Sequence, residues 1–203
     1  MKNYISSKLL KQAVEELSKL PSIGERSALR LALYILQQDK SYTYKLTDAL
    51  NNLRENIKYC KICHNISDTD ICNICNNDKR DHSVVLVIEN IRDFIALENT
   101  NQHNGLYHIL GGVISPINGV GISDLNINSL LNRIEKNNIE EVILALPTTI
   151  EGDTTSLYLY KKLSELNVKI TTIARGVAFG DDLEYTDQIT LGRSIINRIP
   201  FNG

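Results

Sequence analysis

The sequence lacks an apolar run long enough to cross a lipid bilayer, since a membrane-spanning helix needs about 20 consecutive apolar residues. Its first residues, Met1-Lys2-Asn3-Tyr4, do not begin the apolar region of a secretory signal peptide. Tryptophan is absent and methionine occurs once, and neither fact indicates a function. We therefore expect a soluble, cytoplasmic protein without membrane contact.

Cysteine is scarce too, but its four copies lie in one short stretch. Cys60-Lys61-Ile62-Cys63 is followed after eight residues by Cys72-Asn73-Ile74-Cys75. Two thiolates separated by two residues can face one small cation, and a second pair brought back by a turn completes a tetrahedron. Zinc suits four sulfur ligands with no open position, which makes such a site structural. The segment is poor in apolar residues, so metal binding must supply its folding energy.

Other uses of these thiols are less consistent with the pattern. Two disulfides need an oxidising compartment, and a redox dithiol needs one pair rather than two. A four-sulfur iron–sulfur cluster is compatible with the spacing. His64 lies beside Cys63 and is interpreted as a bystander, because four cysteines already complete the ligand set.

Charge is distributed unevenly along the 203 residues. Residues 1–59 carry ten Lys and Arg against six Asp and Glu, whereas residues 83–203 carry nine against fourteen. A basic segment suggests a polyanionic partner, and an acidic one suggests a protein partner or a divalent metal. Ordinary scatter of surface charge is the alternative. The hydrophobic fraction of 42% supports a packed core, in one large domain or two small ones.

The basic segment has the periodicity of helices. Apolar residues at helical spacing predict a first helix over residues 6–19, a second from Glu25 and a third over residues 45–59. We expect the third helix to complete a small bundle. The turn Leu20-Pro21-Ser22-Ile23-Gly24 contains a proline that ends the first helix, and Gly24 permits a backbone conformation closed to most residues.

This helix–turn–helix looks like a helix-hairpin-helix, a module that grips DNA backbone without reading sequence. The amides at the start of the second helix would point at a phosphate. Arg26 and Arg30 are four residues apart and share a face, and Lys19 would join them at the turn in the same grip; we therefore assign all three to DNA binding. Ser22 stands where such hairpins usually have glycine, and Glu25 adds a negative charge. An ordinary helical hairpin with solvated arginines is the alternative.

The acidic segment alternates strand and helix patterns. We predict strands over residues 83–88, 106–110, 141–146 and 168–173, and helices over residues 94–98, 127–137 and 154–166. The run at 83–88 is apolar throughout, as in a strand covered on both faces. The alternation predicts an α/β fold with a mainly parallel sheet and flanking helices.

Carboxylates follow two of these strands. Glu89 ends the first strand, and Glu151-Gly152-Asp153 follows the strand at 141–146. If the strands are neighbours, the three carboxylates converge, where they would hold Mg²⁺ or offer an acidic patch to a basic partner. Exposed loop carboxylates are the alternative. The arrangement resembles the Toprim domain of topoisomerases, primases and some nucleases, although Glu151 stands where that domain has Asp.

The order of the three pieces resembles the RecR family of bacterial recombination mediators over nearly the whole chain. The resemblance divides the sequence into a helix-hairpin-helix arm (1–59), a four-cysteine zinc finger (60–82), a Toprim domain (83–175) and a C-terminal segment for subunit contacts (176–203). Its motifs include Val87-Ile88-Glu89, Ile150-Glu151-Gly152-Asp153, Arg175-Gly176-Val177, Leu183-Glu184-Tyr185 with Asp187, and Thr190-Leu191 ending at Arg198.

The resemblance implies a nucleoid-associated protein without enzymatic turnover that assembles as a ring-shaped homotetramer around DNA. Such proteins act with RecO, and in many bacteria RecF, to help RecA replace single-strand-binding protein. By resemblance, Arg26 and Arg30 line the DNA-facing surface and the four cysteines hold zinc. Glu89, Glu151 and Asp153 lie on a face offered to RecO or RecF.

Two hypotheses of other classes remain open on the residues alone. The Toprim likeness permits a Mg²⁺-dependent nuclease or strand-transferase that uses the three carboxylates. The sequence offers it no dedicated nucleophile, since Tyr158 and Tyr160 are expected on a helix face. A zinc-stapled adaptor that binds only proteins is the third hypothesis.

Overall fold

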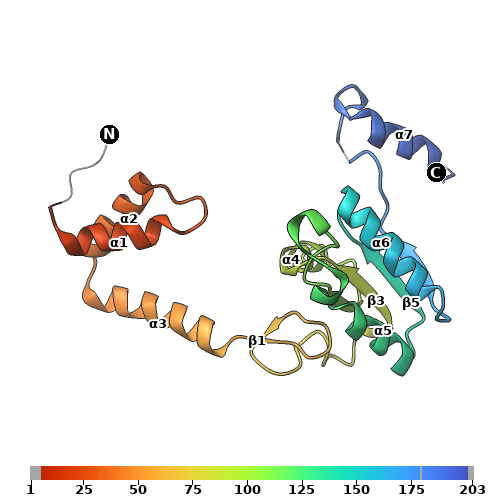
Figure 1. Cartoon of the computed structure of the whole chain (residues 1–203), viewed down its shortest axis with the longest axis horizontal. Helices are drawn as coiled ribbons and strands as arrows, with labels where there is room; N and C mark the ends of the chain where they lie inside the picture. The colour runs from red at the N-terminus through yellow and green to blue at the C-terminus, as the bar shows by residue number, and fades with distance from the viewer. Residues whose placement is uncertain (1–5, 179, 201–203) are drawn as a thin grey trace. The chain divides into compact units, whose positions relative to one another are not determined.

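The computed structural model describes residues 6–178 and 180–200 (Figure 1). The chain divides after Ile57 into two compact units. No helix among the described residues is both long enough and apolar enough to span a membrane.

The first unit is built from three helices, α1 (Lys8–Ser18), α2 (Glu25–Gln37) and α3 (Lys40–Asn56). The core between α1 and α2 is small and centres on Val14, Ala28 and Ala32, all of them buried. Two alanines on one face of α2 leave room for close approach of the two helices. The predicted pair of helices around a tight turn is therefore confirmed.

The third helix differs from its prediction. It begins at Lys40 rather than at residue 45, because the Asp39 side chain accepts a hydrogen bond from the Ser41 amide and caps it. No residue of α3 is buried, and Leu46, Leu50 and Leu53 are 39%, 57% and 58% exposed. The expected three-helix bundle is thus wrong for a single chain, since the core of α1 and α2 closes without α3.

The turn between α1 and α2 places its unusual backbone conformation at an unexpected residue. Ser22 has a φ of 65°, in the left-handed region. Gly24 has a φ of −83° and a ψ of 167°, which any residue adopts, and a Cβ there would meet nothing within 4 Å. The expectation that Gly24 takes the restricted conformation is wrong, and the strain lies at Ser22.

The second unit contains a four-stranded sheet of β3 (Asp81–Ile88), β4 (Gly105–Ile109), β5 (Glu141–Ala145) and β6 (Lys169–Thr172). The strand order is β4-β3-β5-β6 and every neighbouring pair is parallel. The four predicted strands and the parallel sheet are confirmed, and the fold is α/β as expected.

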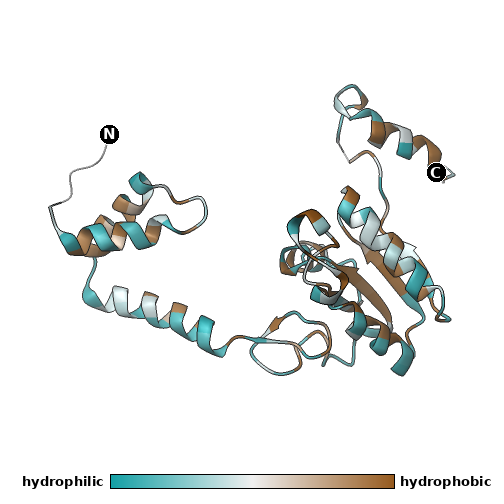
Figure 2. Ribbon diagram, viewed as in Figure 1, coloured by the Kyte–Doolittle hydropathy of each residue, from teal (hydrophilic) through white to brown (hydrophobic). Residues whose placement is uncertain are grey.

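Both faces of this sheet are covered. Val85 and Val87 face a core shared with α5 (Ile127–Lys136) and α6 (Ile150–Leu163), whereas Leu86 and Ile88 face a smaller core beside α4 (Ile91–Glu98). Alternate residues of a strand point to opposite faces, so a strand buried on both sides must be apolar throughout. Figure 2 shows this as hydrophobic strands between amphipathic helices.

A two-stranded antiparallel ribbon, β1 (Lys58–Tyr59) with β2 (Ile66–Ser67), begins the second unit. The sequence did not predict it, because two-residue strands have no periodicity to detect. The described residues also form three short 3₁₀ helices, η1 (Pro116–Asn118), η2 (Ile122–Asp124) and η3 (Leu183–Tyr185), and a further helix, α7 (Gln188–Ile196).

We predict that Ser22→Gly stabilises the α1–α2 hairpin. Relief of the left-handed backbone gains about 1–2 kcal/mol, and the greater freedom of glycine in the unfolded chain offsets about 0.5–1 kcal/mol of it. The expected net gain is about 0.5–1 kcal/mol, measured as slower hydrogen exchange of α1 and α2 amides. Gly24→Ala is the control and should not stabilise the hairpin, because its backbone is ordinary and alanine is a poorer N-cap than glycine. Faster exchange in Ser22→Gly would contradict the assignment of strain.

Candidate functional site

The four cysteines form a buried cluster at the start of the second unit. Their ligand atoms all lie within 4.8 Å of one another, and none of the four residues is more than 7% exposed. None of the four forms a disulfide, and the Sγ atoms of Cys63 and Cys72 are 3.5 Å apart. This is the arrangement that a tetrahedral cation with four sulfur ligands requires.

Backbone hydrogen bonds hold each cysteine pair in a tight turn. The His64 amide donates to the Cys60 carbonyl at 2.9 Å, and the Cys60 amide donates to the Asn65 carbonyl at 2.7 Å. The Cys72 amide points at the Cys60 sulfur at 3.3 Å, and the Cys75 amide points at the Cys72 sulfur at 3.5 Å. Amides directed at sulfur stabilise thiolates, which are the form that binds metal.

The thiols also share protons. Hydrogen bonding from the Cys63 and Cys75 thiols lowers the pKa of Cys72, and donation to Cys72 raises the pKa of Cys63 to about 12. A lowered pKa favours the thiolate at Cys72, which is the form that binds metal. The soft, buried, four-sulfur donor set fits zinc, and it leaves no position for a substrate or a water.

His64 lies outside the cluster and links the finger to the sheet domain. Its backbone has a φ of 64°, and its Nε2 lies 2.8 Å from the Ser129 Oγ on α5. The Ile109 amide at the end of β4 donates to the Cys63 carbonyl at 2.9 Å. The finger is thus hydrogen-bonded to the sheet domain, and the interpretation of His64 as a bystander to the metal agrees with this geometry.

The predicted DNA-binding residues lie at and beside the turn of the first unit. Lys19 follows the end of α1, is exposed, and its Nζ lies 2.7 Å from the Glu16 carboxylate. Arg26 and Arg30 are exposed on the first two turns of α2. Within residues 6–178 and 180–200, neither arginine forms an ion pair with a carboxylate.

The start of α2 differs from the starts of its neighbours. The side chains of Ser7 and Asp39 cap α1 and α3, but Gly24 offers α2 no side chain and no other side-chain cap is present among the described residues. The first amides of a helix have no partner within the helix. These amides carry the positive end of the helix dipole, so an anion such as a phosphate is favoured there.

The three predicted carboxylates follow two neighbouring strands, β3 and β5, but do not form a metal-binding group. Glu89 follows β3, while Glu151 and Asp153 lie in the first turn of α6 rather than in a loop. In the part of the chain that the structure describes, only the four cysteines bring three or more ligand residues together closely enough for one ion. Burial, and then the nearby Asp93, raise the pKa of Glu89, so its charge is poorly stabilised.

Asp153 is engaged by two arginines that the carboxylate prediction did not include. Its two carboxylate oxygens lie 2.7 Å from Arg175 Nη1 and 3.4 Å from Arg193 Nη2. The Arg175 hydrogen bond is the main cause that lowers the pKa of Asp153. These ion pairs connect α6 with α7 and the segment before it. No periodicity in the sequence could pair residues 22 and 40 positions apart.

Gly152 between the two carboxylates has a steric role. A Cβ at this position would lie 2.0 Å from the Pro147 carbonyl oxygen, so no larger residue fits without movement of the backbone. The Gly152 amide donates to the Thr149 Oγ1 at 3.1 Å, which caps α6. The glycine therefore lets α6 begin directly against the loop that follows β5.

Comparison with known families covers almost the whole chain. Family models match in chain order: the RecR helix-hairpin-helix over residues 10–54, the RecR four-cysteine zinc finger domain over 57–77, the Toprim domain over 83–174, and the RecR C-terminal segment over 176–199. Full-length relatives agree. The "Recombination protein RecR" of Bacteroides fragilis is 56% identical over 203 residues, which is 100% of this chain and 99% of that protein.

The chain belongs to the RecR family. The "Recombination protein RecR" of Parabacteroides distasonis is 54% identical over 202 residues, covering 100% of this chain and 97% of that protein. That of Flavobacterium johnsoniae is 56% identical over 196 residues, covering 97% and 95%. As in the RecR model for this segment, the buried cysteine cluster is a four-cysteine zinc site, and the predicted cofactor is confirmed.

We predict one zinc ion per chain, without iron or sulfide, because four buried thiolates satisfy zinc completely. Removal of the metal by a strong chelator should unfold the finger, since metal binding supplies its folding energy. Elemental analysis of the purified protein measures the first outcome, and hydrogen exchange over residues 58–77 measures the second. Iron with sulfide, or a well-ordered finger without metal, would contradict the assignment.

We predict that Asp153→Asn loosens the C-terminal segment. The folded pKa of Asp153 lies below its unfolded value near 4, so the ion pairs stabilise at neutral pH and are lost as pH falls through the folded pKa. Because the Asp153 side chain is 40% exposed, the expected loss is about 0–1 kcal/mol. The readout is proteolytic cleavage between residues 175 and 188. Glu151→Gln is the control, and equal cleavage in both variants would contradict the prediction.

Proposed function

We propose that this protein is a recombinational repair mediator that forms a ring-like clamp on DNA and has no catalytic turnover of its own. In this proposal it acts with RecO, and with RecF where that protein occurs, to load RecA onto gapped or single-stranded DNA. Membership of the RecR family supports the proposal, as do three features of the structure.

The uncapped start of α2 is the observation that carries the DNA-binding part. Its first amides have no side-chain cap among the described residues, and Arg26 and Arg30 stand exposed on the turns that follow. Amides and arginines at these positions bind phosphate without contact to bases. The grip is therefore independent of sequence and weakens as salt concentration rises.

The exposed apolar residues of the first unit support assembly. Leu46, Leu50 and Leu53 recur along α3 at helical spacing and remain exposed in the single chain. Leu31 and Leu36 of α2 are exposed as well. Contiguous apolar surface of this kind marks a protein interface. A homotetrameric ring covers such surface, and a closed ring retains DNA even when each phosphate contact is weak.

The acidic face of the sheet domain suits a partner better than a catalytic metal. Asp153 is already paired with Arg175 and Arg193, whereas Glu89 has a raised pKa and no hydrogen bond to its side chain within the described residues. A carboxylate with poorly stabilised charge favours the approach of a basic side chain. We therefore assign Glu89, Glu151 and Asp153 to the RecO or RecF contact and not to cleavage of DNA.

The test compares retention of the purified protein on closed circular and linear DNA, with its mass in solution measured in parallel. A clamp should form a tetramer that stays on circles and slides off linear molecules. Arg26→Ala/Arg30→Ala should keep the tetramer and reduce binding at least tenfold. Gly24→Asp should also reduce binding, and it should stabilise α2 by only about a few tenths of a kcal/mol, because the new carboxylate caps the helix where phosphate would bind.

Two control variants separate this grip from general charge. Lys45→Ala/Arg54→Ala removes two positive charges from α3 and should affect binding much less. Glu89→Gln should leave both tetramer and retention unchanged. A persistent monomer, or undiminished DNA binding in Arg26→Ala/Arg30→Ala, would contradict the clamp. Cleavage of DNA with Mg²⁺ that disappears in Glu89→Gln would favour the nuclease hypothesis instead.

A further inference from the structure

Arg133 is a buried arginine on α5 whose charge has no carboxylate partner in the described structure. The residue is 8% exposed, and its Nη1 donates to the Tyr107 carbonyl at 2.8 Å. Its Nη2 is buried and lacks any hydrogen-bond partner among the described residues. A buried charge costs several kcal/mol unless an opposite charge or a full set of hydrogen bonds compensates for it.

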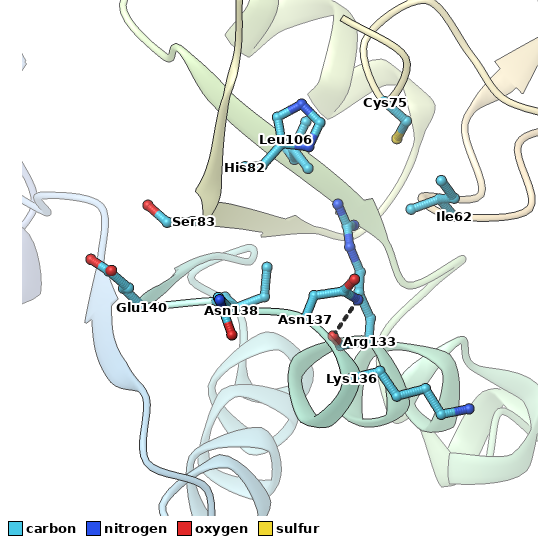
Figure 3. Close-up of a pocket in the computed structure, with 11 residues that line it drawn as sticks. Ile62, Cys75, His82, Ser83, Leu106, Arg133, Lys136, Asn137, Asn138 and Glu140 are labelled. Atoms are coloured by element: carbon cyan, nitrogen blue, oxygen red, sulfur yellow. Dashed lines mark hydrogen bonds between the residues drawn. The ribbon is translucent and has the colours of Figure 1, made fainter. Parts of the chain in front are cut away.

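A cavity of about 690 Å³ beside Arg133 does not supply that compensation. Cys75, Ile62 and Lys136 are among its lining residues. Figure 3 shows the guanidinium of Arg133 extending from α5 toward Cys75 and Ile62. Nη2 is shielded from the solvent in the cavity. The groups that can compensate its charge are therefore those of the protein around the guanidinium.

The four cysteines are protein groups near Arg133, because Cys75 lines the same cavity as Arg133 and its ligand atom is within 4.8 Å of those of the other three. Burial lowers the pKa of Arg133, and Cys75, Cys63, Cys60 and Cys72, in descending order, oppose this by favouring its charged form. Four thiolates around one Zn²⁺ carry a net charge of −2, and in a buried site such charge is weakly screened. A fixed cation close to the sulfur ligands stabilises such a negatively charged centre.

No other cation that the structure describes on the sheet side can take this role. His108 follows Tyr107 on β4. Burial lowers its pKa to about 3, so its ring is neutral. Its Nε2 lies 2.8 Å from the Asn126 carbonyl, to which it donates. On the solvent side, Lys61 is exposed and its Nζ lies 2.6 Å from Asp70, which cancels much of its charge.

We propose that Arg133 is the internal countercharge of the zinc tetrathiolate and that it couples metal binding to the folding of the sheet domain. Its guanidinium donates to the sheet at Tyr107 and extends toward Cys75 of the finger, so one side chain lies between the two. Loss of zinc would leave Arg133 buried without compensation. The sheet domain is then destabilised together with the finger.

The test measures zinc affinity of the full-length protein by competition with a chromogenic chelator. Arg133→Met, which keeps the length and loses the charge, should weaken zinc binding at least tenfold, and Arg133→Lys should recover part of the loss. Lys136 lines the same cavity but is exposed. The Lys136→Met variant should therefore bind zinc as the unaltered protein does. Leu130 is buried in the core on the same helix. The zinc affinity of Leu130→Ala therefore shows how much affinity is lost through lower stability alone.

The proposal is overturned if Arg133→Met binds zinc as tightly as the unaltered protein, or loses no more affinity than Leu130→Ala. If Arg133→Met does not fold, Arg133→Lys and Arg133→Gln decide the question. Both can donate a hydrogen bond to Tyr107, but only lysine carries charge, so lysine should hold zinc at least tenfold more tightly. Equal affinity in these two variants also overturns the proposal. Cobalt substitution provides a second readout, as the sulfur-to-cobalt absorption band reports the intact tetrathiolate.

Discussion

The finger that begins the second unit, residues 58–77, depends on the bonds between four sulfur atoms and one metal ion. Residues 58–77 contribute little to the apolar core apart from the cysteines themselves and Ile62 and Ile74. Zinc binding therefore provides the free energy that orders this segment. The Cys63 carbonyl then accepts a hydrogen bond from the end of β4, so the order of the finger extends directly into the sheet.

Both the metal site and the α/β fold could be predicted from the sequence, because each has a local sequence pattern. The spacing of the cysteine pairs specifies a tetrahedral site whatever surrounds it, and the apolar run at 83–88 specifies a strand covered on both faces. Both signals are local in the sequence. The order of strands β4-β3-β5-β6 was not predicted, because the handedness and crossover rules of parallel sheets permit several orders.

The features that could not be predicted come from interactions between distant residues or from backbone conformation. The sequence did not indicate that Asp153 pairs with Arg193, which lies 40 residues away. Gly24 was expected to be the special residue of the hairpin turn, yet Ser22 holds the positive φ. The leucines of α3 were correctly predicted to form an apolar stripe, but the predicted bundle was wrong for a single chain. The sequence does not say whether the same chain or another copy covers that stripe.

The hydrogen bond from Ile109 to Cys63 also has a consequence for biosynthesis. Both cysteine pairs precede β4 and α5 in the chain, so they leave the ribosome first. Until β4 follows, the inner side of the finger is open to water and the Cys63 carbonyl lacks its Ile109 partner. The nascent finger can therefore bind zinc before the sheet domain covers that side.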